Sequence, residues 1–249
     1  MALVAVAFFT IPIVGLLQET NWSSMGADLT TPAALEAIRL SIVCSLAAVA
    51  LAAAFGIPLA WLLARSNIPG RPLFRALVLL PMVLPPVVGG VALLSAFSLR
   101  SPMGGWLHET FGIQLTFTTW GAILAETFVS MPFFVITVEA AFRNLDQRYE
   151  QVAATLGASR ATVFTRVTLP SIAPALAAGA VLTWARALGE FGATITFAGN
   201  IAGRTRTLPL AVYLSLEGDR DTAIALSLVL LTISLVVLVA LRDRWLSRI

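Results

Sequence analysis

A series of long apolar stretches constrains this chain more than any other feature of its sequence. Six segments approach or exceed the roughly 20 residues that a helix needs to cross a bilayer core: residues 2–17, 38–63, 73–98, 117–142, 172–198 and 222–241. Lipid offers no partners to backbone N–H and C=O groups, so segments that cross it are helical. Only 12% of the 249 residues are charged, which is too few to cover a water-facing surface. We therefore predict an all-α membrane protein with six transmembrane helices and exclude a soluble enzyme.

The first stretch, residues 2–17, is short enough to fit a secretory signal peptide as well. A signal peptide carries basic residues before its apolar core. No arginine or lysine precedes Arg39, and no clear cleavage site of small residues follows the stretch. We therefore expect this stretch to be a membrane span.

The placement of the basic residues predicts the orientation. The chain has 16 arginines and no lysine, with a net charge of +3. With six spans, one side of the membrane receives Arg65, Arg71, Arg75, Arg143, Arg148, Arg160, Arg166, Arg242, Arg244 and Arg248. The positive-inside rule assigns this side, and both termini, to the cytoplasm. Because no internal repeat or linker interrupts the pattern, we expect a single transmembrane domain over residues 1–249.

The predicted cytoplasmic loop at residues 143–171 has an organised sequence. Residues 145–156 suit a short amphipathic helix, and Gly157 supplies a break where a positive φ costs little. Ser159 is placed to cap a second helix that runs through Arg166. Two short helices at an angle would offer a docking surface to a partner protein, although an idle solvated loop explains the same residues.

The same loop resembles part of a known signature. Gly157, nine further residues and the run Val167–Pro170 match the G-x9-[IV]-x-L-P half of the signature of bacterial ABC-importer permeases. The Glu-Ala-Ala half departs from the pattern, because its positions read Gln151, Val152 and Ala153, with Glu150 displaced by one residue. In that family the loop is a pair of coupling helices seated in a cleft of the cytosolic ATPase subunit. The resemblance therefore assigns ATPase coupling to Glu150, Gln151, Ala153, Ala154, Gly157, Val167, Leu169 and Pro170.

Further segments narrow the resemblance to the oxyanion branch of these permeases. Residues 186–194, 197–200 and 205–210 are similar to permeases for molybdate, tungstate and sulfate, and the run Leu80–Gly90 is similar to molybdate permeases in particular. The similarity extends from about residue 35 to residue 242. It implies the type I ABC importer permease fold and the import of molybdate, with tungstate and sulfate or thiosulfate as alternative cargoes.

The resemblance also implies partners. Two copies of the chain would form a pore in a bacterial cytoplasmic membrane, each held by a cytosolic ABC ATPase subunit. An extracytoplasmic binding protein would deliver the oxyanion. ATP and magnesium would bind to the ATPase, so this chain is expected to be a transport subunit with no catalytic residues and no cofactor of its own. A phosphate-binding loop of the form G-x-x-x-x-G-K-[ST] needs a lysine, and this chain has none.

Ionisable residues inside predicted spans are candidates for the translocation path, because charge is costly to bury in lipid. Arg186 and Glu190 lie one helical turn apart and can pair. We expect Arg186 to face the pore and help a divalent oxyanion to pass, with Glu190 holding it when the path is empty. A structural ion pair is the alternative. Glu126 needs a hydrogen-bonding partner, and Glu139 is expected to reach water or to pair.

Three prolines mark the third predicted span. Pro81, Pro85 and Pro86 each lack a backbone donor and must bend a helix there. A broken segment that lines the pore or forms a gate is the functional hypothesis, and a merely kinked helix is the alternative.

Other classes of function fit the sequence less well. An intramembrane enzyme needs a Ser/His, His/Asp or metal-ligand set, yet the one histidine, His108, lies in a predicted external loop and Cys44 is the one cysteine. We therefore predict no metal site. A secondary transporter would have an inverted repeat and more than six spans. The small net charge gives no indication of nucleic-acid binding.

Overall fold

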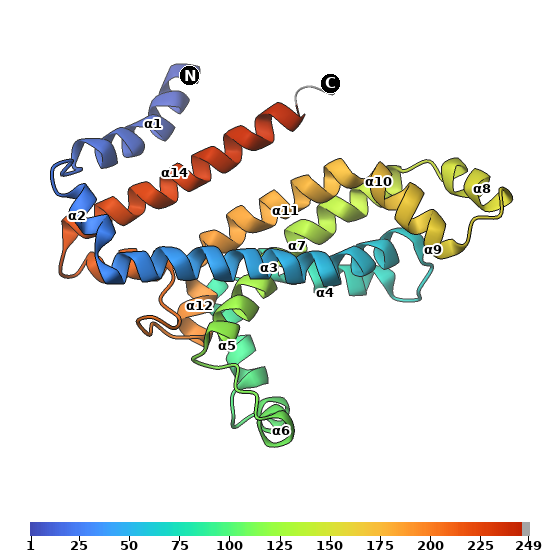
Figure 1. Ribbon diagram of the computed structural model, residues 1–249, viewed down its shortest axis with the longest axis horizontal. Coiled ribbons are helices and arrows are strands. Elements are labelled where there is room, and N and C mark those ends of the chain that lie inside the picture. Colours follow the sequence, from blue (N-terminus) through green and yellow to red (C-terminus); the bar gives the residue numbers. More distant parts are fainter. Residues whose placement is uncertain (246–249) are drawn as a thin grey trace.

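The computed structural model describes residues 1–245, and every regular element in that part of the chain is a helix (Figure 1). The elements are α1 (Ala2–Gln18), α2 (Met25–Thr30), α3 (Pro32–Arg65), α4 (Arg71–Val83), α5 (Pro86–Phe97), α6 (Pro102–Phe111), α7 (Thr119–Asn144), α8 (Arg148–Thr155), α9 (Arg160–Val163), the π-helix η1 (Phe164–Thr168), α10 (Leu169–Ser171), α11 (Ala173–Leu188), α12 (Gly192–Phe197), α13 (Leu208–Ser215) and α14 (Arg220–Trp245). The all-α prediction is confirmed. Arg248 and the end of the predicted domain lie outside the described residues.

Helices α3, α7 and α11 form the centre of the fold and pack against one another (Figure 1). One side of α3 is made of small residues, which lets neighbouring helices approach closely. The buried small residues of α3 are Ala34, Ala37, Ser41, Cys44, Ser45, Ala48, Ala52, Gly56 and Ala60. A side chain at Gly56 would not fit, because its Cβ would lie 2.8 Å from Cδ1 of Phe134 on α7.

Two hydrogen bonds attach further helices to α3. Trp184 Nε1 on α11 donates to Ser45 Oγ over 2.9 Å, and the backbone N–H of Leu208, the first residue of α13, donates to Ser41 Oγ over 2.6 Å. Buried polar groups of this kind need partners in an apolar surrounding. The two serines therefore make α3 the scaffold on which α11 and α13 are positioned.

Three helices in the described part of the chain are long and apolar enough to cross a membrane unbroken: α3, α7 and the Arg220–Val237 part of α14. Two further candidates are helix pairs that bend sharply, α4 with α5 at 117° and the segment Arg160–Ser171 with α11 at 67°. The apolar helix α1 has 17 residues and no buried side chain. The structure thus contains three to five candidate spans by length and composition, and a sixth, formed by α1, stays a prediction.

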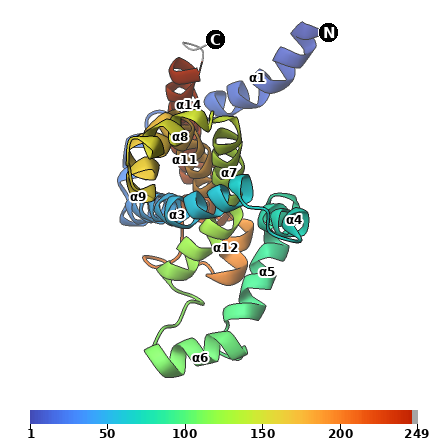
Figure 2. The same ribbon diagram turned by 90° about the vertical axis from the view of Figure 1, so that its right-hand side faces the viewer.

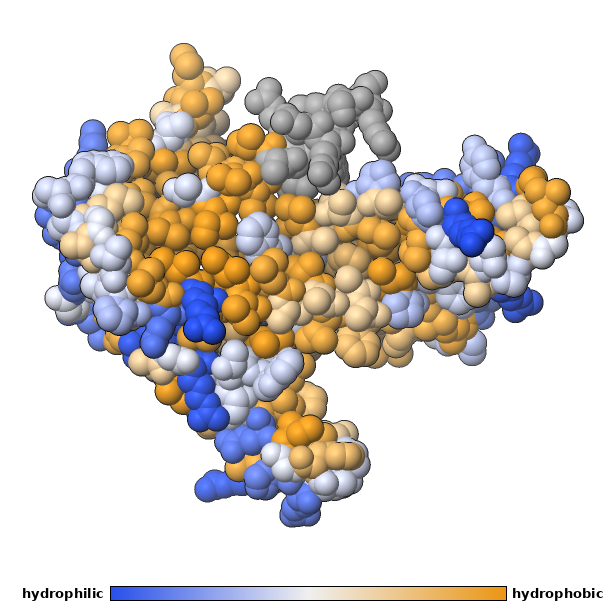
Figure 3. Space-filling model, viewed as in Figure 1, coloured by the Kyte–Doolittle hydropathy of each residue, from blue (hydrophilic) through white to orange (hydrophobic). Residues whose placement is uncertain are grey.

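The surface is apolar in the middle and polar at its ends (Figure 3). Apolar side chains cover the face between α2 and the start of α14 on one side and the protruding helices α8 and α9 on the other. We call the second side, formed by residues 65–75 and 143–171, the arginine-rich end, since it carries Arg65, Arg71, Arg75, Arg143, Arg148, Arg160 and Arg166. Viewed along the long axis, α5 and α6 project away from the central helices (Figure 2).

Candidate translocation path and coupling surface

The proline run divides the predicted third span into two helices. Pro81 lies inside α4, Pro85 is the N-cap of α5 and Pro86 is its first residue. Leu84 and Pro85 are extended, with ψ angles of 135° and 132°, because a residue that precedes a proline avoids the helical region. The predicted bend is confirmed at an angle of 117°, so the stretch 73–98 is not one straight helix. A role of this break as a gate stays a prediction.

The predicted fifth span, 172–198, is divided as well. α11 ends at Leu188 and α12 begins at Gly192. Glu190 bridges the break: its Oε1 accepts a 2.8 Å hydrogen bond from the N–H of Ala193 in α12, and its Oε2 lies 2.7 Å from Nη1 of Arg186 in α11. The carboxylate thus supplies an acceptor to the first turn of α12, as an N-cap does.

The Arg186–Glu190 pair predicted from the sequence is therefore formed. Its two side chains are unequally enclosed, since that of Glu190 is 1% exposed and that of Arg186 is 28% exposed. The negative charge is buried by the break, and the positive charge reaches an open surface. The arrangement is compatible with both roles considered for the pair, and the pore-facing role of Arg186 stays a prediction.

The two breaks lie against each other where α5 packs on α12 (Figure 2). An added Cβ at Gly90 of α5 would lie 2.6 Å from the Thr196 Cβ and 2.9 Å from the Ala193 carbonyl oxygen. An added Cβ at Gly192 of α12 would lie 2.9 Å from the Pro86 Cβ. Both glycines are buried, and the two helices meet backbone to backbone. The proline break and the Glu190 break are consequently parts of one packed junction.

Glu126 lies on α7 and is 1% exposed. One turn before it on α7, Ala122 packs in a buried cluster with Cys44 of α3 and with Ala198, the residue that follows α12. Within the described residues its Oε2 is fully enclosed and has no hydrogen-bond partner in the protein. The expected partner of this oxygen is therefore not found among the described residues.

Glu139, near the other end of α7, is also 1% exposed and is paired with two arginines. Arg75 Nε on α4 donates to its Oε2 over 3.1 Å, and Arg143 Nη2 lies 2.6 Å from its Oε1. The expected pairing is confirmed, whereas direct contact with water is not. The cluster ties α4 to α7 at the arginine-rich end and leaves one positive charge in excess.

At this end of the molecule, α8 ends in the geometry that the loop sequence predicts. Gly157 has a φ of +84°, the N–H of Gly157 donates to the Ala154 carbonyl, and the N–H of Ala158 donates to the Ala153 carbonyl. These two bonds define a Schellman motif, which places glycine at the left-handed position after a helix. Ser159 then caps α9 by accepting from the N–H of Thr162 over 3.2 Å. The glycine of the expected motif thus has a direct structural cause, which is the positive φ that the Schellman motif requires at residue 157.

The large exposed side chains of α8 are not among the residues that the resemblance assigns to ATPase coupling. Tyr149, Val152 and Leu156 are 63%, 59% and 83% exposed, and their spacing of i, i+3 and i+7 puts them on one side of the helix. We call these three residues the apolar face of α8. Ala154 and Gln151 are exposed as well, whereas Ala153 is half-buried. The apolar face was not predicted, although its spacing is visible in the sequence.

The second half of the loop is helical through Arg166, as predicted, but it extends further and is less regular. α9 ends at Val163, and the π-helix η1 continues the chain past Arg166 to Thr168. Leu169 and Phe164 pack on a buried cluster that contains Leu63 and Phe142. Val167 is half-buried and Pro170 is exposed, and the bend before α11 falls at Ile172 rather than at Pro170.

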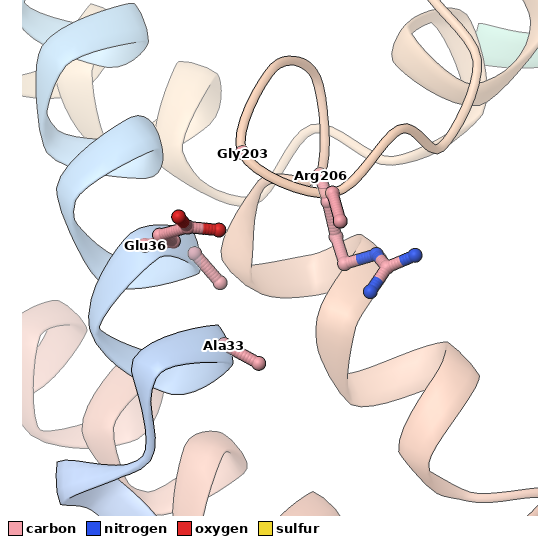
Figure 4. Close-up of a pocket in the computed structure, with 6 residues that line it drawn as sticks. Ala33, Glu36, Gly203 and Arg206 are labelled. Carbon is pink, nitrogen blue, oxygen red and sulfur yellow. The ribbon is translucent and has the colours of Figure 1, made fainter.

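A small crevice lies far from the arginine-rich end, between α3 and the loop that precedes α13 (Figure 4). Ala33, Glu36, Ala37, Ala202, Gly203 and Arg206 line it. The Glu36 carboxylate points toward Gly203, while the Arg206 guanidinium is turned away and its Nε donates to Asn200 Oδ1 over 2.9 Å. A carboxylate in its wall makes the crevice unfavourable for an oxyanion. Among the described residues no three His, Cys, Asp or Glu side chains are grouped to hold a metal.

The all-helical fold with divided spans matches that of a chain from a solved ABC transporter. The chain superposes on one from the crystal structure of a bacterial alginate ABC transporter in complex with an alginate pentasaccharide-bound periplasmic protein. The TM-score is 0.77 over 97% of this chain and 91% of that one, at 21% identity. Residues 56–248 match the family of binding-protein-dependent transport system inner membrane components, and the chain belongs to this family.

Two curated relatives cover nearly the whole chain. The molybdenum transport system permease protein ModB of Mycobacterium tuberculosis (strain ATCC 25618 / H37Rv) is 46% identical over 98% of this chain and 92% of the relative. The sulfate transport system permease protein CysT of Escherichia coli (strain K12) is 39% identical over 91% of this chain and 82% of the relative. The resemblance to ABC-importer permeases is confirmed. The chain is a multi-pass membrane transport subunit and not an enzyme.

Proposed function

We propose that the chain is the permease subunit of an ATP-driven importer that carries molybdate across the bacterial cytoplasmic membrane. Family membership supports the transport role. The choice of cargo is supported by the higher identity to the molybdenum permease, 46%, than to the sulfate permease, 39%. Tungstate and sulfate or thiosulfate are the alternative cargoes, because they are divalent oxyanions as well.

The proposed topology has six spans, with α1 as the first and both termini in the cytoplasm. The charge distribution supports it, because the arginine-rich end carries most of the arginines that the positive-inside rule assigns to the cytoplasm. Arg242 and Arg244, after the apolar part of α14, belong to the same set. We propose one transmembrane domain over residues 1–249, with the loop 143–171 as its cytoplasmic coupling segment.

The single observation that carries the proposal is the apolar face of α8. Three large side chains stand in solvent at the tip of the arginine-rich end, where no lipid would cover them. An exposed apolar patch of this kind is typical of a protein interface. We propose that each of two copies of the chain presents this face to a cytosolic ABC ATPase subunit. ATP and magnesium would be bound by the ATPase, with no cofactor held by this chain.

The path would run past the junction of the two breaks. α11 connects the coupling segment to the Glu190 break, so a displacement of the segment reaches Arg186 along one helix. A guanidinium that is paired with Glu190 attracts an anion weakly, which suits passage because a strong site would trap its cargo. An extracytoplasmic binding protein would deliver the oxyanion at the opposite end.

Transport of the proposed cargo can be measured in liposomes that contain the permease, its ATPase and its binding protein. We expect uptake of labelled molybdate that requires both ATP and the binding protein. We also expect tungstate to compete with molybdate more strongly than sulfate does. Uptake of sulfate in the absence of any molybdate uptake would assign the chain to the alternative cargo. Uptake without the ATPase would refute the importer class.

Copurification tests the apolar face separately. Leu156→Ser should remove a side chain that is 83% exposed at the C-cap of α8 and lower the yield of copurified ATPase severalfold. Leu216→Ser is the matched control, because Leu216 is 60% exposed after α13, far from α8. Equal ATPase yields with the two variants would show that α8 is not the docking surface.

A further inference from the structure

The coupling helix α8 is attached to the rest of the protein mainly through one side chain. It has no buried residue, and its principal neighbours are η1 and α9. The following segment is anchored differently, because Phe164 and Leu169 pack on the buried cluster around Leu63. Among the hydrogen bonds and ion pairs in the described part of the chain, Glu150 makes the side-chain links from α8 to other elements.

One oxygen of Glu150 joins three segments. Its Oε1 accepts a 2.7 Å hydrogen bond from the Thr168 hydroxyl at the end of η1, and it lies 3.7 Å from Nη2 of Arg65, the last residue of α3. Thr168 is 2% exposed, and the side chains of Arg65 and Glu150 are 12% and 25% exposed. We call Arg65, Glu150 and Thr168 the coupling tie.

Arg65 is incompletely satisfied in this conformation. Its Nε and Nη2 are enclosed, and neither has a hydrogen-bond partner within the described residues. Charge-assisted N–H···O bonds are about 2.7–2.9 Å long. The 3.7 Å between Arg65 Nη2 and Glu150 Oε1 is therefore about 1 Å too long for such a bond. An enclosed cation without a hydrogen bond is unfavourable, and a small approach of α8 to α3 would relieve that cost.

We propose that the coupling tie transmits the displacement of α8 to α3, and that the Arg65–Glu150 contact closes into a hydrogen bond when the ATPase moves α8. The proposal rests on the proposed function, because it takes α8 to be seated on an ATPase. α3 is about 51 Å long by its helical rise and holds α11 and α13 through Ser45 and Ser41. Motion at Arg65 thereby reaches both the Glu190 break and the opposite end of the protein, in parallel with the route through α11. Arg65 and Thr168 are positioning residues in this scheme.

The test compares uptake per ATP hydrolysed in the assembled importer. Arg65→Gln and Glu150→Gln should each lower this ratio about tenfold while the ATPase still copurifies, and Arg65→Lys should give an intermediate value. The double variant should be no worse than the poorer single variant, because both substitutions remove one interaction. Arg220→Gln is the matched control, since it opens an exposed Arg220–Glu19 pair of 2.6 Å far from α8 and should leave the ratio unchanged.

An unchanged ratio in both single variants overturns the proposal, and so does a double variant whose loss is the product of the two single losses. Failure of the unaltered chain to retain an ATPase would instead refute the proposed function. If the Gln variants do not assemble, Arg65→Lys and Glu150→Asp provide a second measurement, because each keeps its charge and changes the length or shape of the contact. Each should lower the ratio of uptake to ATP hydrolysed severalfold, and an unchanged ratio in both overturns the proposal.

Discussion

Substitution of Gly157 by valine isolates the backbone requirement of the coupling loop. Gly157 has a φ of +84°, and an added Cβ would meet no atom within 4 Å. The cost of a side chain there is consequently conformational and not steric. The left-handed region costs an L-residue about 1–2 kcal/mol, and a β-branched residue more. Relief of this strain would break the two Schellman bonds to the carbonyls of Ala153 and Ala154 and re-aim α8.

The substitutions at this position should rank by their tolerance of a positive φ. Asn is expected to retain most coupling, Ala to lose part of it at a cost of about 1 kcal/mol, and Val to lose the most at about 2 kcal/mol, or roughly 30-fold in the population of the correct loop. The assay is molybdate uptake per ATP hydrolysed in liposomes. Gly218→Val is a suitable control, because Gly218 also faces open space and does not have a positive φ.

The order of the three substitutions decides the outcome. Normal import with normal ATPase activity in the Gly157→Val importer would refute the assignment of the loop. An Ala variant as defective as the Val variant, with Asn equally poor, would show that the side chain collides with the docked ATPase and that backbone strain is not the cause.

Three further predictions concern other regions. Arg186→Gln should lower uptake about tenfold while assembly is retained, and undiminished uptake would rule out its role in the path. Gly90→Ala should lower the stability of the purified complex by about 1–3 kcal/mol, because the added methyl group overpacks against α12. Gly15→Ala is the control, since its Cβ would meet no atom within 4 Å and its stability should not fall. Equal melting temperatures of the two variants would contradict the packed junction. Asp219 precedes α14 and accepts hydrogen bonds from the side chain and the N–H of Thr222, which hold the pKa of its carboxyl below the ordinary value. The ionised carboxylate therefore caps α14 at neutral pH, and the cap is lost as the pH falls through the lowered pKa. Thr222→Val should raise that pKa in a carboxyl NMR titration, and an unchanged value would contradict the assignment.

Much of the architecture could be predicted from the sequence, because the features concerned are local. The bend at Pro85, the turn at Gly157 and the pairing of Arg186 with Glu190 each depend on residues within a few positions of one another. Proline, glycine and the helical repeat act at that range. The signature that begins at Gly157 indicates the family for the same reason, since its residues form one short segment of the chain.

The remaining features depend on contacts between distant residues. Arg65 lies near Glu150, and Arg75 pairs with Glu139, although these residues are far apart in the sequence. Helical periodicity relates only residues a few positions apart, so it does not predict these contacts. The break after Leu188 was missed because the sequence 172–198 is apolar throughout most of its length, and the carboxylate of Glu190 accepting from α12 is what stabilises the interruption. The lack of a partner for Glu126 Oε2 could not be foreseen either, since its neighbours come from other helices.

The glycine contact between α5 and α12 has a mechanical consequence. Where two helices touch through side chains, rotamer changes absorb small shifts and each helix can turn slightly on its own. At Gly90 and Gly192 the helices have less of this freedom, because an added Cβ on either glycine would lie within 3.1 Å of a backbone atom of the other helix. A rotation of either helix would therefore press on the backbone of the other. The proline break and the Glu190 break are for this reason expected to move together when the protein changes conformation.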